Sequence, residues 1–235
     1  MNRVEPKTNH SPQILRNIGG ILFFLFTFGT VAIFPQNYDE VITNIETKRT
    51  ELASIYSSAN NKDSLLSAAQ EFLFDKIVNE IFPAWYNTKW DFNGTTTIPQ
   101  KGKIACGYFV TTILEHAGFK LPRVKWAQLA SEAIILKLNK DVKKFRNRPV
   151  KEVIDYISTS GKGLYIVGLD IHVGFIVNDG EEISFVHSNY YKPEIGVMKE
   201  SLEGNNPLAD SKYRVIGKIL HKTMVEKWIT DVWLD

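Results

Sequence analysis

One cysteine carries the residue type that nucleophilic catalysis needs. The 235-residue chain has a single cysteine, Cys106, at the start of the segment ACGYFVTTILEHAG. The apolar spacing of this segment predicts a buried helix that ends at Gly118. The positive end of a helix favours a thiolate, and so does a nearby imidazolium. Cys106 is therefore a candidate nucleophile, with inert packing of a buried thiol as the alternative.

Two histidines flank a predicted β-hairpin. Asp179 and Gly180 separate two apolar, β-branched runs, and Asp-Gly at this position predicts a two-residue type I′ turn. That turn sets a register in which His172 lies directly opposite His187 on one face of the sheet. Beside a thiol, one histidine can act as the general base while a second polar residue orients its imidazole. Asn189 can share the face, and its amide is the alternative orienting group.

The other histidines offer less to this chemistry. His116 follows Cys106 on the same helix and lies about 15 Å away along the axis, so it cannot be the base. His10 and His221 are expected at the surface, His221 at the end of a strand. A zinc site of Cys106 with the two hairpin histidines is a further alternative, but the hairpin supplies no fourth ligand. We therefore expect no metal and no cofactor.

The first elements of the chain are predicted to be helices. Apolar residues at helical spacing predict one helix over 38–57 and a second that ends at Pro83, with the polar segment SANNKD between them. Residues 37–83 are thus expected to form a helical hairpin ahead of the main domain.

The main domain, residues 84–235, combines helices with a later sheet. Alternating and β-branched runs after Gly163, together with a strand over 213–222, predict an antiparallel meander. Helices are expected at about 125–145 and at 149–158. Helices followed by strands indicate an α+β fold in which an antiparallel sheet packs on helices.

Residues 1–36 carry a membrane or export signal in our interpretation. Residues 18–34 contain no charged side chain and follow basic residues. That length is short for a membrane span, so a signal peptide and an uncleaved N-terminal anchor are both consistent with it. Either reading exports the rest of the chain, whereas a buried core helix would not.

The charge balance argues against nucleic acid as a partner. The net charge is +2 and the isoelectric point is about 8.5. A nucleic-acid-binding domain needs a concentrated basic face. The densest basic stretch, residues 140–148, is expected to be the solvated face of a helix.

The cysteine segment and the hairpin together resemble a known enzyme family. ACGYFVTTILEHAGF followed by DIHVGFIVNDGEEISFVHS is similar to the NlpC-type cell-wall cysteine peptidases, which have a papain-like fold. The similarity covers roughly residues 85–222. It implies that Cys106 is the nucleophile, His172 the base and His187 the orienting residue. The chain departs from the family at Ala105 and after Cys106, where Ser-Gly is usual.

The resemblance also implies a substrate, and together with the uncharged segment 18–34 it implies a location. It points to an exported cysteine hydrolase, a peptidase or amidase that cleaves an amide bond in peptidoglycan stem peptides. The protein would be periplasmic or anchored to the inner membrane. Trp90, Asp91 and Asn93, in the loop before the nucleophile, are candidate substrate-binding residues. A non-catalytic, membrane-tethered binding module and an acyltransferase of the same fold are the alternatives.

Overall fold

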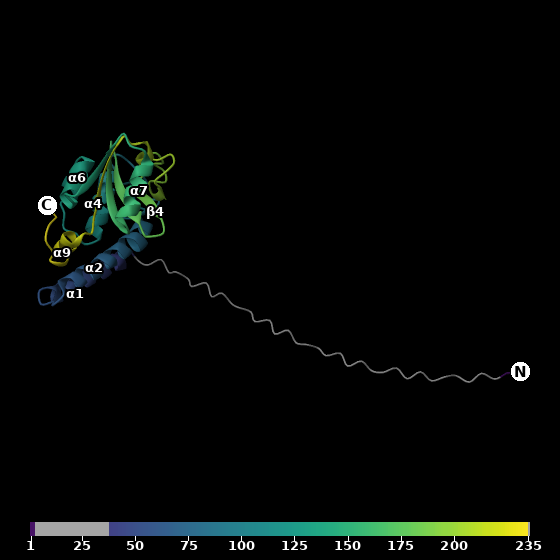
Figure 1. Cartoon of the computed structure of the whole chain (residues 1–235), viewed down its shortest axis with the longest axis horizontal. Helices are drawn as coiled ribbons and strands as arrows, with labels where there is room; N and C mark the ends of the chain where they lie inside the picture. The colour runs from purple at the N-terminus through teal and green to yellow at the C-terminus, as the bar shows by residue number, and fades with distance from the viewer. Residues whose placement is uncertain (3–37, 235) are drawn as a thin grey trace. The chain divides into compact units, whose positions relative to one another are not determined.

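A pair of helices begins the larger described part of the chain. The computed structural model describes residues 1–2 and 38–234. Helices α1 (Tyr38–Tyr56) and α2 (Lys62–Lys76) lie side by side and are joined by a short polar loop (Figure 1). Both predicted helices are therefore present. The uncharged segment 18–34 lies outside the described residues, and no described helix combines the length and apolar character that crossing a bilayer requires.

Pro83 does not end the second helix, contrary to the prediction. A π-helical turn, η1 (Ile77–Ile81), continues α2 into the short helix α3 (Phe82–Trp85). Pro83 falls in the first turn of α3, where a missing backbone N–H is tolerated. The α3 segment buries Phe82 and Trp85 completely, so it brings the hairpin into the core that also surrounds α4.

A single antiparallel sheet of six strands forms the centre of the described structure. The strand order is β1-β6-β2-β3-β4-β5, and every neighbouring pair is antiparallel. Strands over 163–188 and 213–218 were predicted, whereas those over 142–146 and 197–201 were not, and the α+β class is confirmed. The strands are β1 (Val142–Arg146), β2 (Gly163–Leu169), β3 (Val173–Asn178), β4 (Ile183–Ser188), β5 (Val197–Ser201) and β6 (Tyr213–Lys218).

The basic stretch 140–148 is a strand and not a helix face. The predicted helix over 125–145 is replaced by α5 (Arg123–Ala127), α6 (Ser131–Leu138) and the edge strand β1. In β1 only Phe145 is buried, and the lysines and arginines around it are partly or fully exposed. Lysines are typical of edge strands because they discourage pairing with another chain. Pairing with β6 decides the conformation here over local preference.

Alternating strand residues fill two hydrophobic layers. On β2, Leu164 and Ile166 face the larger cluster, which contains α4 (Cys106–His116) and the helical hairpin. Tyr165 and Val167 face the smaller cluster, which contains α7 (Val150–Ser160). This period of two buries the sheet on both faces. The start of α4 is thereby held firmly against β3 and β4.

The C-terminal end of the chain corrects one histidine assignment. His221 does not end a strand at the surface. It caps α9 (Lys222–Ile229) by accepting the N–H of Met224, and its Nε2 contacts the carbonyl oxygen of Leu138 at 2.9 Å. The helix α9 packs on α1 and α2 and contributes Trp228 to their shared core. A further short helix, α8 (Pro207–Asp210), precedes β6.

Candidate active site

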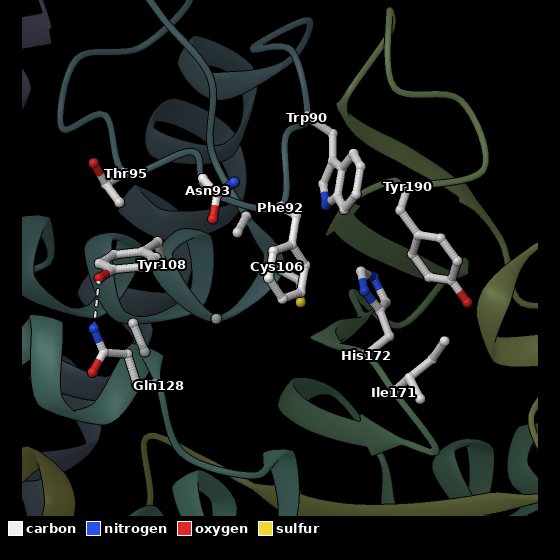
Figure 2. Close-up of a pocket in the computed structure, with 13 residues that line it drawn as sticks. Trp90, Phe92, Asn93, Thr95, Cys106, Tyr108, Gln128, Ile171, His172 and Tyr190 are labelled. Atoms are coloured by element: carbon white, nitrogen blue, oxygen red, sulfur yellow. Dashed lines mark hydrogen bonds between the residues drawn. The ribbon is translucent and has the colours of Figure 1, made fainter.

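Cys106 begins α4 and faces a cavity. The helix starts at this residue after Ala105, as the sequence predicts. The next residue must be glycine, because a Cβ at Gly107 would lie 2.3 Å from the carbonyl oxygen of Ala127 on α5. Cys106 is partly exposed and lines a cavity of about 820 Å³, into which its sulfur points (Figure 2).

His172 lies across this cavity from the thiol. Figure 2 shows its imidazole facing the sulfur of Cys106, with Trp90 and Tyr190 beside it. The residue is almost fully buried. Its Nδ1 has no hydrogen-bond partner among the described residues, whereas most buried polar atoms in proteins have one. An unpartnered ring nitrogen beside a thiol is what a proton acceptor for that thiol requires.

A chain of hydrogen bonds leads away from the far side of His172. Its Nε2 lies 2.8 Å from Nδ1 of His187, and Nε2 of His187 lies 2.8 Å from a carboxylate oxygen of Glu200 on β5. Asn189 forms no hydrogen bond with His172. Its amide nitrogen instead donates to the same Glu200 carboxylate oxygen at 3.2 Å, and its amide oxygen accepts the N–H of Tyr191. Of the two candidate orienting residues, His187 is therefore the one in contact.

The carboxylate of Glu200 determines which ring nitrogens of His187 and His172 carry protons. An ionised carboxylate only accepts hydrogen bonds, so Nε2 of His187 carries the proton and its Nδ1 accepts. Nε2 of His172 must then donate to that acceptor. In a neutral imidazole the other nitrogen is unprotonated. The lone pair of His172 thus lies on Nδ1, the nitrogen on the cavity side.

The hairpin register differs from the predicted one by two residues. Asn178 pairs with Ile183, and four residues instead of two form the loop. The side chain of Asp179 stabilises this longer loop because it accepts the N–H groups of Glu181 and Glu182 at 2.9 and 2.8 Å. A shift of two residues keeps each side chain on its face of the sheet, so the histidines still meet.

Glycine in the His-Val-Gly segment has a packing role in the corrected register. Gly174, not His172, is the neighbour of His187 across the strands. A Cβ on Gly174 would lie 2.8 Å from the Cβ of His187 and 2.7 Å from the ring of Phe185. The missing side chain lets His187 stack on Phe185, with ring centroids 4.0 Å apart. His187 then reaches His172 diagonally.

Burial keeps the nucleophile and both imidazoles neutral at rest. It raises the pKa of the Cys106 thiol, an effect that the backbone N–H groups of Val173, Gly107 and Cys106 only partly offset. Burial, followed by the charge of His187, lowers the pKa of His172 well below its usual value. The expected resting thiolate is therefore not favoured. The geometry instead suits proton transfer to His172 during attack.

Glu200 remains charged at the end of the chain of hydrogen bonds. Burial raises the pKa of its carboxyl, but hydrogen bonds from His187 and Lys192 outweigh this and lower it overall. Burial lowers the pKa of His187, and Glu200 partly offsets that effect. A carboxylate held here can stabilise positive charge that develops on His172 through His187.

Two of the three predicted substrate-binding residues line the cavity. Trp90 and Asn93 are in its wall, and Trp90 keeps a buried Nε1–H without a partner in the described part of the chain. Asp91 does not line the cavity. Its carboxylate accepts the N–H of Asn93 at 2.9 Å and pairs with Lys103 at 3.1 Å, so it shapes the loop instead.

Sequence reasoning missed several contributors to the site, among them Glu200, Phe92 and Tyr190. Glu200 lies on a strand that was not predicted, and no motif distinguishes it. Phe92 and Tyr190 line the cavity from the loop before Cys106 and the segment after β4. Both are next in sequence to residues that were predicted for the site, and this adjacency is the signal that could have found them.

The hydrogen bonds of His187 do not match the zinc alternative. Both ring nitrogens of His187 are hydrogen-bonded, and no group of three potential ligands among residues 38–234 is placed to hold a metal ion. Comparisons with family models, with curated proteins and with solved structures found no match to this chain.

Proposed function

We propose that this chain is a cysteine hydrolase of papain-like fold that cleaves an amide bond through an acyl-enzyme. The observation that carries the proposal is the unpartnered Nδ1 of His172, on the cavity side of an imidazole held by His187 and Glu200 and facing Cys106. A helix that packs with the nucleophile against an antiparallel sheet supports the fold assignment. The resemblance of the segments around Cys106, His172 and His187 to NlpC-type peptidases is consistent with the same proposal.

In the proposed first step, Cys106 attacks the carbonyl carbon of the scissile amide. Nδ1 of His172 accepts the thiol proton as the carbon–sulfur bond forms. The oxyanion of the tetrahedral intermediate accepts hydrogen bonds from backbone N–H groups at the start of α4. Collapse of the intermediate breaks the carbon–nitrogen bond, and the imidazolium returns its proton to the leaving amine.

In the second step, water releases the acyl group. His172 accepts a proton from the water as it attacks the thioester, and then returns that proton to the sulfur of Cys106. An amine in place of water would make the same site an acyltransferase. The hydrogen bonds through His187 to Glu200 keep His172 in one tautomer through both steps.

The proposed substrate is the stem peptide of peptidoglycan, and the proposed location is the periplasm. Both rest on the resemblance and on the uncharged segment 18–34, which lies outside the described residues. Full-length wild type and Cys106→Ala should be incubated with purified cell-wall sacculi and with casein, and the products read by mass spectrometry. Cys106-dependent stem-peptide fragments would support the proposal.

The same assay separates the alternatives. Cleavage of casein while the sacculi stay intact would support the proposed hydrolase mechanism and contradict the proposed stem-peptide substrate. The absence of any Cys106-dependent product, with an added amine acceptor included, would favour a binding module.

A further inference from the structure

We propose that the cavity beside Cys106 binds an uncharged, largely apolar acyl group, aromatic or branched aliphatic, which forms the carbonyl side of the scissile bond. This inference rests on the cysteine chemistry of the proposed function, and it names an acyl group that differs from the charged and small residues of the proposed stem-peptide substrate. It is carried by the walls of the cavity and not by the catalytic residues.

The walls of the cavity are apolar and aromatic. None of the thirteen residues that line it is an aspartate, glutamate, lysine or arginine. Two side chains at its rim, Phe92 and Ile171, are each 78% exposed although both are large and apolar. Exposed apolar side chains around a concave site are typical of ligand-binding surfaces. The principal apolar walls are Trp90, Phe92, Tyr108, Ile171 and Tyr190.

Two charged groups near the cavity, Asp91 and Arg123, already have partners. The carboxylate of Asp91 is held by Lys103 and by a backbone N–H. The guanidinium of Arg123 lies over the ring of Tyr108 but donates to the hydroxyl of Thr112 and to the carbonyl oxygen of Thr95. A charged substrate group in the cavity would thus lose water without gaining a counter-charge, which is strongly unfavourable.

The indole N–H of Trp90 is a polar group in the wall that has no partner in the described part of the chain. The buried Nε1–H of Trp90 has no acceptor within residues 38–234, and Figure 2 shows this nitrogen on the side of the indole toward Phe92 and Cys106. A buried N–H left unpaired costs free energy, which a ligand acceptor would recover. A carbonyl oxygen of an amide or ester is an uncharged acceptor of that kind.

The volume favours a group larger than alanine. About 820 Å³ lies toward the upper end of the range for small-molecule sites. A methyl side chain would leave most of it unfilled, whereas an aromatic or branched group can contact several walls at once. A stem peptide would have to keep its carboxylates outside the cavity.

The test uses N-acetyl-aminoacyl chloromethyl ketones with phenylalanyl, leucyl, glutaminyl, glutamyl and lysyl side chains. The sulfur of Cys106 displaces chloride and forms a thioether, and intact-protein mass spectrometry reads the product because the chain has one cysteine. Each rate is divided by the iodoacetamide rate of the same protein. We expect the phenylalanyl and leucyl reagents to exceed the glutamyl and lysyl reagents at least tenfold, with the glutaminyl reagent between them.

Substitutions at the rim connect the preference to the cavity. Ile171→Lys should raise the ratio of glutamyl to phenylalanyl labelling at least fivefold. Ile55→Lys, at an exposed apolar position on α1, should leave the ratio unchanged. Equal or faster labelling by the glutamyl or lysyl reagent of wild type would overturn the inference, and so would an unchanged ratio in Ile171→Lys.

Turnover distinguishes this inference from the proposed function. Coumarin amides of the same five acyl groups report hydrolysis, whereas the labelling reports cavity preference alone. Selective labelling without Cys106-dependent hydrolysis or transfer would retain the apolar cavity and contradict the enzyme. Hydrolysis of the coumarin amides without a preference for apolar acyl groups would retain the enzyme and contradict the apolar cavity.

Discussion

The two ends of α4 each hold a histidine in a polar cluster, and the clusters differ in what is left unpaired. At the C-terminal end, Nδ1 of His116 lies 2.8 Å from the hydroxyl of Tyr38, which accepts the indole N–H of Trp85. At the N-terminal end, His172 keeps an unpartnered Nδ1 toward Cys106.

This difference separates a structural histidine from a candidate base. Burial lowers the pKa of both: that of His116 falls to about 4, with Arg123 as the second cause, and that of His172 falls well below its usual value. A lowered pKa therefore does not identify the site. A free lone pair beside a thiol and a cavity does.

The largest expected effect is on the rate of product release, and it should differ between substitutions at the two ends of α4. Cys106→Ala and His172→Ala should each reduce Cys106-dependent product release by about 10⁴-fold, because they remove the nucleophile or its base. His116→Gln should stay within about threefold of wild type when it is folded. Initial rates with circular dichroism as a folding control measure this. A loss in His116→Gln as large as that in His172→Ala would erase the contrast.

His187 should matter less than His172 and more than Asn189. His187→Ala leaves the base without its partner, and we expect a loss of about 10²-fold in kcat/KM. His187→Asn should be milder, because an amide can still accept a hydrogen bond from His172. Asn189→Ala should cost less than either. A larger loss in Asn189→Ala than in both His187 variants would reassign the orienting role.

Glu200 should act through His187, with an effect of about tenfold. Glu200→Gln removes the charge that makes His187 donate from Nε2, so the tautomer of His172 is no longer determined. Glu182→Gln provides a control, since the carboxylate of Glu182 pairs with the exposed side chain of Lys199. In wild type the acid limb of kcat/KM should lie below pH 6.5, because the pKa of His172 is lowered. An unchanged rate and pH profile in Glu200→Gln would exclude this positioning role.

The smallest expected effect is on acid stability. The unfolded chain protonates His116 near pH 6.5, whereas the folded chain does so near pH 4. Between these values the unfolded state binds more protons, so the free energy of unfolding falls as pH falls from 6.5 to 4. His116→Gln should flatten part of this slope in urea titrations, whatever its absolute stability. His172 and His187 contribute with the same sign. An identical slope would contradict the lowered pKa.

The sequence predicted the elements of the site better than their connections. Local patterns identified the helix that starts at Cys106 and the common face of His172 and His187, because both depend on short-range periodicity. The exact hairpin register depended on the side-chain bonds of Asp179, which stabilise a four-residue loop over the two-residue turn.

Long-range pairing explains what could not be predicted. Glu200 reaches His187 only because β5 pairs with β4, and its strand contains no motif. Residues 142–146 form a strand because β6 lies beside them. In both segments, polar residues obscured the pattern that periodicity arguments need. The proposed export signal and the hydrolase activity remain predictions.

The protonation state of His172 tests the central claim most directly. Nitrogen-15 NMR of imidazole-labelled, full-length protein at pH 7 distinguishes protonated from unprotonated ring nitrogens without any substrate. The hydrogen-bond chain predicts a neutral His172 with an unprotonated Nδ1 and a proton on Nε2, and Glu200→Gln should alter that assignment. A proton on Nδ1 of His172 in the wild type would contradict the claim, because that nitrogen could not then accept the proton of Cys106.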